Sequence, residues 1–211
     1  MSRWRRHHLL WPSEAPQADR PDDQARASAW QAQGRPFVIT RRRDDSDALG
    51  LGFCTTDPRH PELRPRRVAA RLAADRVVRT APPPTLAEVA VCPAARRHAE
   101  AFGRLDEAAR DAGLTLRVYG SWMWQALTSE PHVHDASDLD LLVEVVDGAA
   151  AIAAADLLAA QETDLGLRID GELSFAGRGE VNWREFRQAT AEVLLKSVDG
   201  LRLVARAELA T

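Results

Sequence analysis

An alternation of helix-like and strand-like segments fills the chain from residue 95 to its end, and it constrains the fold more than any other feature of the sequence. Between Ala95 and Ala112, apolar residues recur at spacings of three and four, as on one face of an amphipathic helix. Gly113 is suited to end that helix in a left-handed conformation. Such an alternation predicts a sheet layered with helices, and hence an α/β or α+β fold. The further segments expected are helices at 121–128, 149–160 and 182–191 and strands at 114–119, 139–146, 167–175, 193–197 and 201–204.

The first 80 residues are less regular, and Pro82-Pro83-Pro84 separates them from the rest as a stiff break. We therefore predict an α+β protein of two domains. A small basic α/β domain is expected at residues 1–88, and a domain with a mixed sheet flanked by helices at 89–211. The elements expected in the first part are helices at 23–33 and 85–91 and strands at 37–40, 49–53, 68–74 and 77–78.

Charge is distributed unevenly between the two parts. Residues 1–80 hold 16 arginines and 10 acidic residues, a net charge of +6, whereas the remainder holds 12 basic and 21 acidic residues, a net charge of −9. This asymmetry suits a ligand with several phosphates, bound between a cationic wall and carboxylates that hold a metal ion. Two ordinary solvated faces would give the same counts.

Several classes of protein are excluded by composition. No run of about 18 apolar residues is present, so no membrane span is expected, and Leu9-Leu10-Trp11 is too short for the core of a signal peptide. Cys54 and Cys92 cannot form a disulfide framework, and they suit a reducing interior. We expect a soluble cytoplasmic protein. The charge and the scattered aromatic residues argue against a nucleic-acid surface.

The informative motif is Asp138-x-Asp140 at the start of an apolar strand. Residues two apart in a strand point to the same face, so the two carboxylates should lie side by side. Adjacent carboxylates repel one another unless a cation lies between them, and magnesium prefers such oxygen ligands together with substrate phosphates. The alternative is an edge strand that exposes two solvated acids.

Gly120-Ser121 favours the metal interpretation because it lies between a strand and a helix, upstream of the two acids. Glycine lets the backbone approach a phosphate, and amides at a helix start donate hydrogen bonds to it. The Ser121 hydroxyl could cap the helix or bind phosphates. A turn and cap without ligand would look the same in isolation, but the combination with Asp-x-Asp is more specific.

A third carboxylate is expected from a neighbouring strand, where Asp170 and Glu172 share one face. Asp170 is preferred because it lies between Ile169 and Gly171, and Glu172 remains the alternative. Three carboxylates that hold two magnesium ions would permit a two-metal phosphoryl transfer, with Asp170 as acceptor of the nucleophile's proton.

Together these motifs resemble the nucleotidyltransferase superfamily of DNA polymerase β type, which is marked by Gly-Ser, Asp-x-Asp and a third acid. Residues 119–125, 137–142 and 180–185 bring the chain closer to one family, the phosphoribosyl-dephospho-CoA transferases of malonate decarboxylase systems. Residues 7–11, 35–38 and 49–52 and the proline-rich break extend the resemblance over nearly the whole chain. One departure is the long spacing from Gly-Ser to Asp-x-Asp, which requires a loop at 129–137.

The resemblance implies a polymerase-β-like domain and a specific reaction. Members of the family transfer the 2′-(5″-phosphoribosyl)-3′-dephospho-CoA group from its triphosphate precursor, triphosphoribosyl-dephospho-CoA, to a serine of the apo acyl-carrier subunit of malonate decarboxylase and release diphosphate. Two alternatives remain open: a nucleotidyltransferase that uses ATP or CTP on an antibiotic, protein or RNA hydroxyl, and a non-enzymatic nucleotide-binding module.

Other residues offer weaker signals. Arg41, in the run 41–43, could bind phosphates of the donor, and Lys196 could reach the triphosphate as a point charge. Either could equally be a solvated surface cation. His132 and His134 are possible ligands of a structural metal, although a plain loop is favoured. Trp122 and Trp124 could stack on adenine, but their spacing is more typical of a core.

Overall fold

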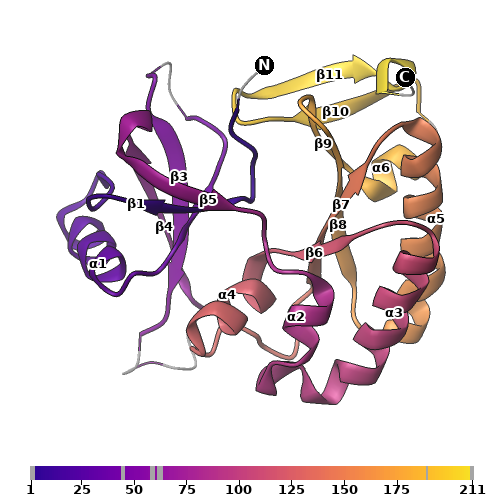
Figure 1. Cartoon of the computed structure of the whole chain (residues 1–211), viewed down its shortest axis with the longest axis horizontal. Coiled ribbons are helices and arrows are strands. Elements are labelled where there is room, and N and C mark those ends of the chain that lie inside the picture. The colour runs from indigo at the N-terminus through magenta and orange to yellow at the C-terminus, as the bar shows by residue number, and fades with distance from the viewer. Residues whose placement is uncertain (1–2, 44–45, 58–59, 61–63, 189, 210–211) are drawn as a thin grey trace.

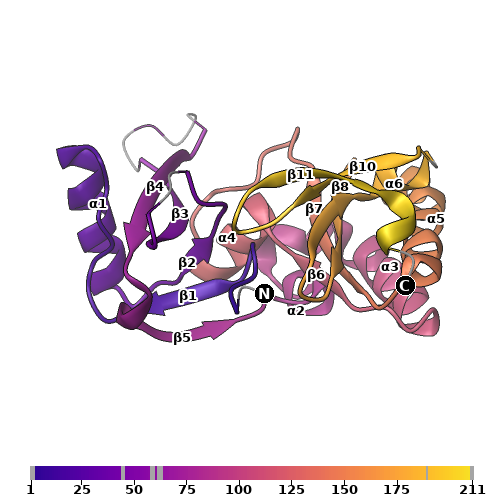
Figure 2. The ribbon, with the colours of Figure 1, turned by 90° about the horizontal axis from the view of Figure 1, so that it is seen from above.

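Two β-sheets, one from each half of the chain, organise the fold (Figure 1). The structure is a computed structural model that describes residues 3–43, 46–57, 60, 64–188 and 190–209. The two sheets lie beside each other, with helix α4 (Gly120–Thr128) between them (Figures 1 and 2). A continuous core of buried apolar side chains extends through both halves.

The first sheet is antiparallel, and its strand order is β4-β3-β2-β1-β5. Helix α1 (Pro21–Ala32) covers its outer side, where the Trp30 ring lies 5.0 Å from that of Phe53. The sequence pattern did not predict β1. This strand pairs with β2 and β5, and the side chains of its Leu9 and Leu10 are both buried. The strands are β1 (Leu9–Pro12), β2 (Phe37–Ile39), β3 (Leu49–Thr55), β4 (Arg66–Leu72) and β5 (Val77–Ala81), with a 3-10 turn at Ala74–Arg76.

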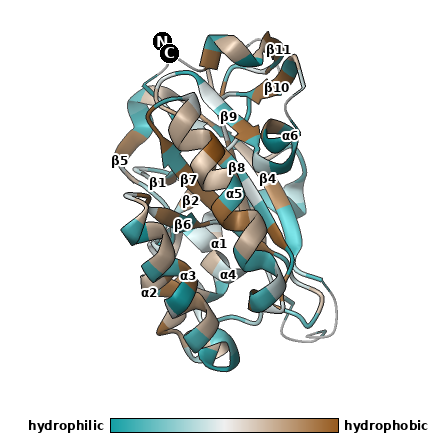
Figure 3. Ribbon diagram, turned by 90° about the vertical axis from the view of Figure 1, so that its right-hand side faces the viewer, coloured by the Kyte–Doolittle hydropathy of each residue, from teal (hydrophilic) through white to brown (hydrophobic). Residues whose placement is uncertain are grey.

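The second sheet is mixed, with the order β11-β10-β9-β8-β7-β6 and a parallel pair formed by β7 and β8. Figure 3 looks onto the side where α5 and α3 lie over its strands. This confirms the predicted α+β class and the helix-flanked sheet. The strands are β6 (Leu116–Val118), β7 (Leu139–Val145), β8 (Ile169–Phe175), β9 (Gly179–Asn182), β10 (Glu192–Lys196) and β11 (Leu201–Ala205). The helices are α2 (Leu86–Ala90), α3 (Ala99–Asp111), α5 (Gly148–Leu165) and α6 (Trp183–Arg187), with 3-10 turns at Pro93–His98 and Arg206–Leu209.

The helix boundaries follow local chemistry. The Asp147 side chain caps α5 by accepting from the Ala150 amide at 2.8 Å, and Gly166 ends that helix at a φ of +68°. Gly113 ends α3 in the same conformation, as predicted, at a φ of +70°. These caps fix the entry and exit of the helices that carry the chain to β6 and β8, the strands beside β7.

The predicted division between residues 88 and 89 falls inside α2, and the division itself stays a prediction. Helix α2 packs on α3 and β6 of the second sheet. Within the described ranges, no helix is both long and apolar enough to cross a membrane.

Candidate active site

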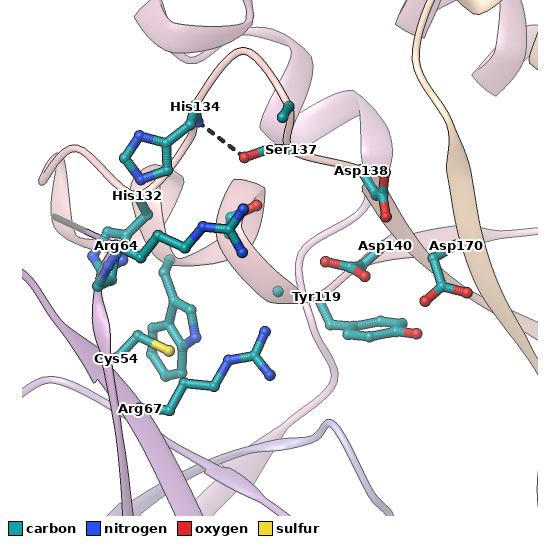
Figure 4. Close-up of a pocket in the computed structure, with 15 residues that line it drawn as sticks. Cys54, Arg64, Arg67, Tyr119, His132, His134, Ser137, Asp138, Asp140 and Asp170 are labelled. Carbon is teal, nitrogen blue, oxygen red and sulfur yellow. Dashed lines mark hydrogen bonds between the residues drawn. The ribbon is translucent and has the colours of Figure 1, made fainter. Parts of the chain in front are cut away.

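A cavity of about 730 Å³ lies where the two sheets and α4 meet (Figure 4). We refer to it as the acidic cavity because three aspartates lie on one side of it. Its remaining wall comes from β3, β4, α4 and the loop between α4 and β7. The lining residues are Cys54, Arg64, Pro65, Arg67, Tyr119, Gly120, Ser121, Trp124, His132, His134, Ala136, Ser137, Asp138, Asp140 and Asp170.

The three predicted aspartates converge in this cavity. Asp138 immediately precedes β7, Asp140 is the second residue of that strand, and Asp170 is its direct partner on parallel strand β8. Leu139 and Leu141, the residues on either side of Asp140, are fully buried, as the alternation of a strand requires. In Figure 4 the three carboxyl groups gather at one side of the cavity.

The environment of Asp140 shows an excess of negative charge. Burial, together with the charges of Asp170 and Asp138, raises the pKa of Asp140 to about 7. The other two carboxylates have partners: Arg168 Nη1 donates to Asp138 Oδ2 at 3.1 Å, and Asn182 Nδ2 donates to Asp170 Oδ1 at 3.2 Å. Asp140 is therefore the group that a bound cation would stabilise most.

Gly120 permits the close approach of α4 to this carboxylate. Its φ is +69°, and a Cβ atom placed there would lie 1.8 Å from Asp140 Oδ2. The preceding Tyr119 amide donates to the Asp140 carbonyl at 3.0 Å, which fixes the turn against β7. Ser121 lines the cavity from within α4, but it does not cap the helix, because Tyr119 holds the N-cap position.

The wall opposite the aspartates carries basic and imidazole groups. Arg64 and Arg67 reach it from the N-terminal part of the chain, and His132 and His134 reach it from the loop after α4 (Figure 4). His132 is only 2% exposed, and neither of its ring nitrogens has a hydrogen-bond partner among the described residues. Burial lowers the pKa of His132 to about 4, so its ring is neutral at pH 7.

No group of three or more His, Cys, Asp or Glu side chains in the described part of the chain is arranged so that it could hold a metal ion, and this applies to the loop histidines and to the three aspartates alike. A structural metal at His132 and His134 and a magnesium ion on the aspartates both stay predictions from the sequence. An open site on the aspartates agrees with the chemistry of magnesium, which takes one or two carboxylates and completes its shell with water and substrate phosphates.

Glu172 and Lys196 lie in a separate buried ion cluster. Arg6 Nη1, His7 Nε2 and Lys196 Nζ donate to Glu172 at 3.0, 2.9 and 2.8 Å, and Arg6 Nη1 also donates to Glu180 at 2.9 Å. Burial alone would raise the pKa of Glu172, but the contacts with His7, Arg6 and Lys196 outweigh it and hold that pKa well below its usual range. Glu172 lies beside Leu142 rather than beside Asp140, and Lys196 does not line the acidic cavity.

The other predicted residues divide between surface and core. Arg41 is exposed and is not among the described residues that line the cavity. Trp122 is buried against Phe102, with ring centroids 5.2 Å apart, whereas Trp124 borders the cavity. The sequence analysis missed Arg64 and Arg67, and the only signal for them was the proline- and arginine-rich composition of residues 57–67.

Comparison with known proteins assigns the chain to a family. The models for the N-terminal and C-terminal domains of phosphoribosyl-dephospho-CoA transferase MdcG match residues 5–83 and 85–207. The chain belongs to this family. Its membership makes the chain a transferase, and it confirms the resemblance that the motifs indicated.

Curated relatives named phosphoribosyl-dephospho-CoA transferase match the chain along nearly its whole length. A protein of Xanthomonas campestris is 37% identical and one of Xanthomonas euvesicatoria 38%, each over 97% of this chain and 95% of the relative. A Bradyrhizobium diazoefficiens protein is 35% identical over 95% of this chain and 90% of its own. No solved structure matches the chain.

Proposed function

We propose that this chain transfers the 2′-(5″-phosphoribosyl)-3′-dephospho-CoA group from its triphosphate precursor to a serine of the apo acyl-carrier subunit of malonate decarboxylase. The observation that carries the proposal is the arrangement of three carboxylates opposite two arginines and two histidines across one cavity. That arrangement suits a ligand with several phosphates and a divalent cation. The family and the names of its relatives support the choice of donor.

The proposed cofactor is magnesium, held by Asp138, Asp140 and Asp170. The fit rests on the surplus charge that raises the pKa of Asp140 to about 7, and on the hard oxygen donors of all three side chains. When bound, one or two such ions would neutralise phosphate charge and favour ionisation of the attacking hydroxyl. The link from Arg168 to Asp138 is half exposed, so it can yield to a cation at little cost.

The remaining lining residues supply contacts to the phosphates. Arg64 and Arg67, which line the wall opposite the aspartates, would bind the diphosphate that leaves, since guanidinium groups form paired hydrogen bonds with phosphate oxygens. Gly120 and Ser121 at the start of α4 line the same cavity, and the amides of a helix start can donate hydrogen bonds to a phosphate. Ser121 can add a hydroxyl hydrogen bond.

The reaction is an in-line displacement at the phosphorus next to the ribose. The serine Oγ forms a new bond to that phosphorus, and the bond between the phosphorus and the diphosphate oxygen breaks. Asp170 accepts the proton of the serine hydroxyl through its free carboxylate oxygen, while Asn182 holds the other oxygen at 3.2 Å. Donor and acceptor thereby become the modified carrier and diphosphate, with no further reactant.

The test is intact-mass spectrometry of the apo carrier after incubation with the protein, magnesium and the triphosphate donor. We expect the carrier to gain the mass of the prosthetic group, and Asp138→Asn to abolish that gain. Asp135→Asn is the matched control, because Asp135 is an exposed acid of the same loop that pairs with Arg97. If the carrier stays unmodified and the protein instead transfers a nucleotide from ATP or CTP to another hydroxyl, the proposed donor and acceptor are wrong and the chain is a different nucleotidyltransferase. If the protein bound nucleotides with an affinity that does not depend on magnesium, a non-enzymatic binding module would be favoured.

A further inference from the structure

A smaller cavity of about 260 Å³ opens beside the acidic cavity, between the N-terminal sheet and α4. We refer to it as the apolar slot. A ligand with its reacting phosphate at the aspartates can extend into this slot without leaving the protein. The residues that border both cavities are Cys54, Arg67, Tyr119, Gly120 and Trp124.

The floor of the slot is a row of small side chains on the sheet. Gly52 pairs with Val38 on one side and with Ala69 on the other, and all three residues line the slot. Cross-strand partners project to the same face of a sheet. Gly52 has no side chain, and Ala69 has only a methyl group. The Thr40 methyl lies 3.2 Å from the point that a Gly52 Cβ would occupy, so the row leaves a shallow depression bordered by Thr40.

The next row on the same face leads toward the acidic cavity. Cys54 and Arg67 are cross-strand partners, two residues further along β3 and β4 from Gly52 and Ala69. Both of them also line the acidic cavity. Cys54 and Arg67 therefore border both the slot and the wall that faces the aspartates.

The opposite wall is aromatic and held in place. Tyr119 and Met123 lie four residues apart, so they share one side of the helix start, and Trp124 follows them. The His7 ring lies 4.0 Å from the Tyr119 ring, and the Trp30 ring meets the Trp124 ring edge-on at 5.6 Å. A flat floor below a fixed aromatic wall suits a planar ring.

The charge of the lining also selects the ligand. Among the described residues that line the slot none is acidic, and the only guanidinium groups there are those of Arg43 and Arg67. Most of the lining is aliphatic or aromatic. A neutral heteroaromatic ring can stack in such a site, and a guanidinium can interact with its face.

We infer that the apolar slot binds the adenine ring of the donor, an inference that rests on the proposed function. The adenine is joined through its ribose to the phosphoribosyl unit that carries the reacting phosphate, so it belongs beside the aspartates rather than far from them. The pantetheine arm is long and contains polar amides, whereas the slot is short and apolar. The arm therefore extends outside it.

The test uses Ala69→Leu, which fills the depression from its floor. The matched control is Ala81→Leu, the same change at a half-buried strand residue of the same sheet that lines neither cavity. Calorimetry measures binding of dephospho-CoA, adenosine monophosphate and 4′-phosphopantetheine to each protein, and thermal melts check the fold. We expect Ala69→Leu to weaken dephospho-CoA and adenosine monophosphate about tenfold through lost stacking, and Ala81→Leu to leave both unchanged.

A second measurement on the unmodified protein does not depend on either variant. Saturation-transfer NMR on dephospho-CoA should show stronger signals for the adenine protons than for the pantetheine methyl groups. Stronger signals from the pantetheine methyl groups would assign the slot to the pantetheine arm and overturn the inference. The same conclusion would follow if 4′-phosphopantetheine bound the unmodified protein but not Ala69→Leu. Neither measurement involves transfer to a carrier, so a failed transfer assay and a failed slot assignment remain distinguishable.

Discussion

Replacing Gly120 with alanine tests how closely α4 must approach the carboxylates. At a φ of +69° an alanine costs about 1–2 kcal/mol of backbone strain, because its Cβ meets the following carbonyl. That Cβ would also lie 1.8 Å from Asp140 Oδ2, whereas atoms in ordinary contact stay beyond about 3.4 Å. The carboxylate is the end of a side chain and can move, so the protein should still fold. A displacement of about 1 Å or more costs on the order of 10²-fold in rate at a reacting centre.

Gly113→Ala provides the matched control. Gly113 has a φ of +70°, and a Cβ there would meet nothing within 4 Å. Both variants should therefore lose about 1–2 kcal/mol in urea unfolding, since they share the same backbone strain. Only Gly120→Ala should also lose transfer to the carrier, by about 10²-fold in a single-turnover mass assay. Full activity of Gly120→Ala, or an equal loss in Gly113→Ala, would refute the reasoning.

Three further predictions concern charge. Glu172→Gln should lower the free energy of unfolding in urea by about 3 kcal/mol, because it removes the buried anion that pairs with Arg6, His7 and Lys196. Glu180→Gln should lower it by under about 1 kcal/mol, since burial already raises the pKa of Glu180 to about 7. The reverse order would contradict this view of the cluster. Arg67→Ala should raise the KM for the donor about tenfold. Arg66→Ala is the control and should leave the KM unchanged, because Arg66 pairs with Asp23 of α1 instead. Equal effects of the two variants in steady-state kinetics would contradict the role of the cationic wall. Because the pKa of Asp140 is raised to about 7, its proton competes with magnesium below pH 7, so the apparent magnesium affinity should fall by up to about tenfold per pH unit there and level off above pH 8. A magnesium titration that gives the same affinity at pH 6 and pH 8 would count against the assignment.

The local part of the candidate site was predictable from the sequence. The period of a strand places Asp138 and Asp140 on one face, and the alternation of β8 offers Asp170 on the adjacent strand. What separated Asp170 from Glu172 was the register of β7 and β8, in which Asp140 faces Asp170 and Leu142 faces Glu172. Strand register depends on the packing of the whole sheet, so spacing along the chain could not supply it.

Contacts between distant segments were not predictable. The sequence offered Lys196 as a phosphate ligand, but the fold places it 2.8 Å from Glu172 together with Arg6 and His7, more than 160 residues earlier in the chain. Arg64 showed no periodic pattern, and only the arrangement of the two sheets brings it to the cavity.

The ends of elements depended on similar competition. Asn182, the first residue of the helix predicted at 182–191, caps α6 by accepting from the Arg184 and Glu185 amides. The Glu185 side chain instead accepts from the Leu194 amide at 2.7 Å, where a capping box would have turned it back toward Asn182. The helix ends at Arg187, four residues before the predicted end. The Glu185 side chain therefore bonds to β10 rather than to the start of its own helix.

The most direct test of the account is the magnesium dependence of carrier modification in Asp140→Asn. We predict that the unmodified protein transfers the prosthetic group in a magnesium-dependent way, and that Asp140→Asn transfers none at any magnesium concentration while it keeps the melting temperature of the parent or exceeds it. The rise is expected because the variant removes a buried charge that its neighbours repel. Transfer by Asp140→Asn at the parental rate, or transfer by the unmodified protein in excess chelator, would contradict the assignment of the three aspartates as a magnesium site.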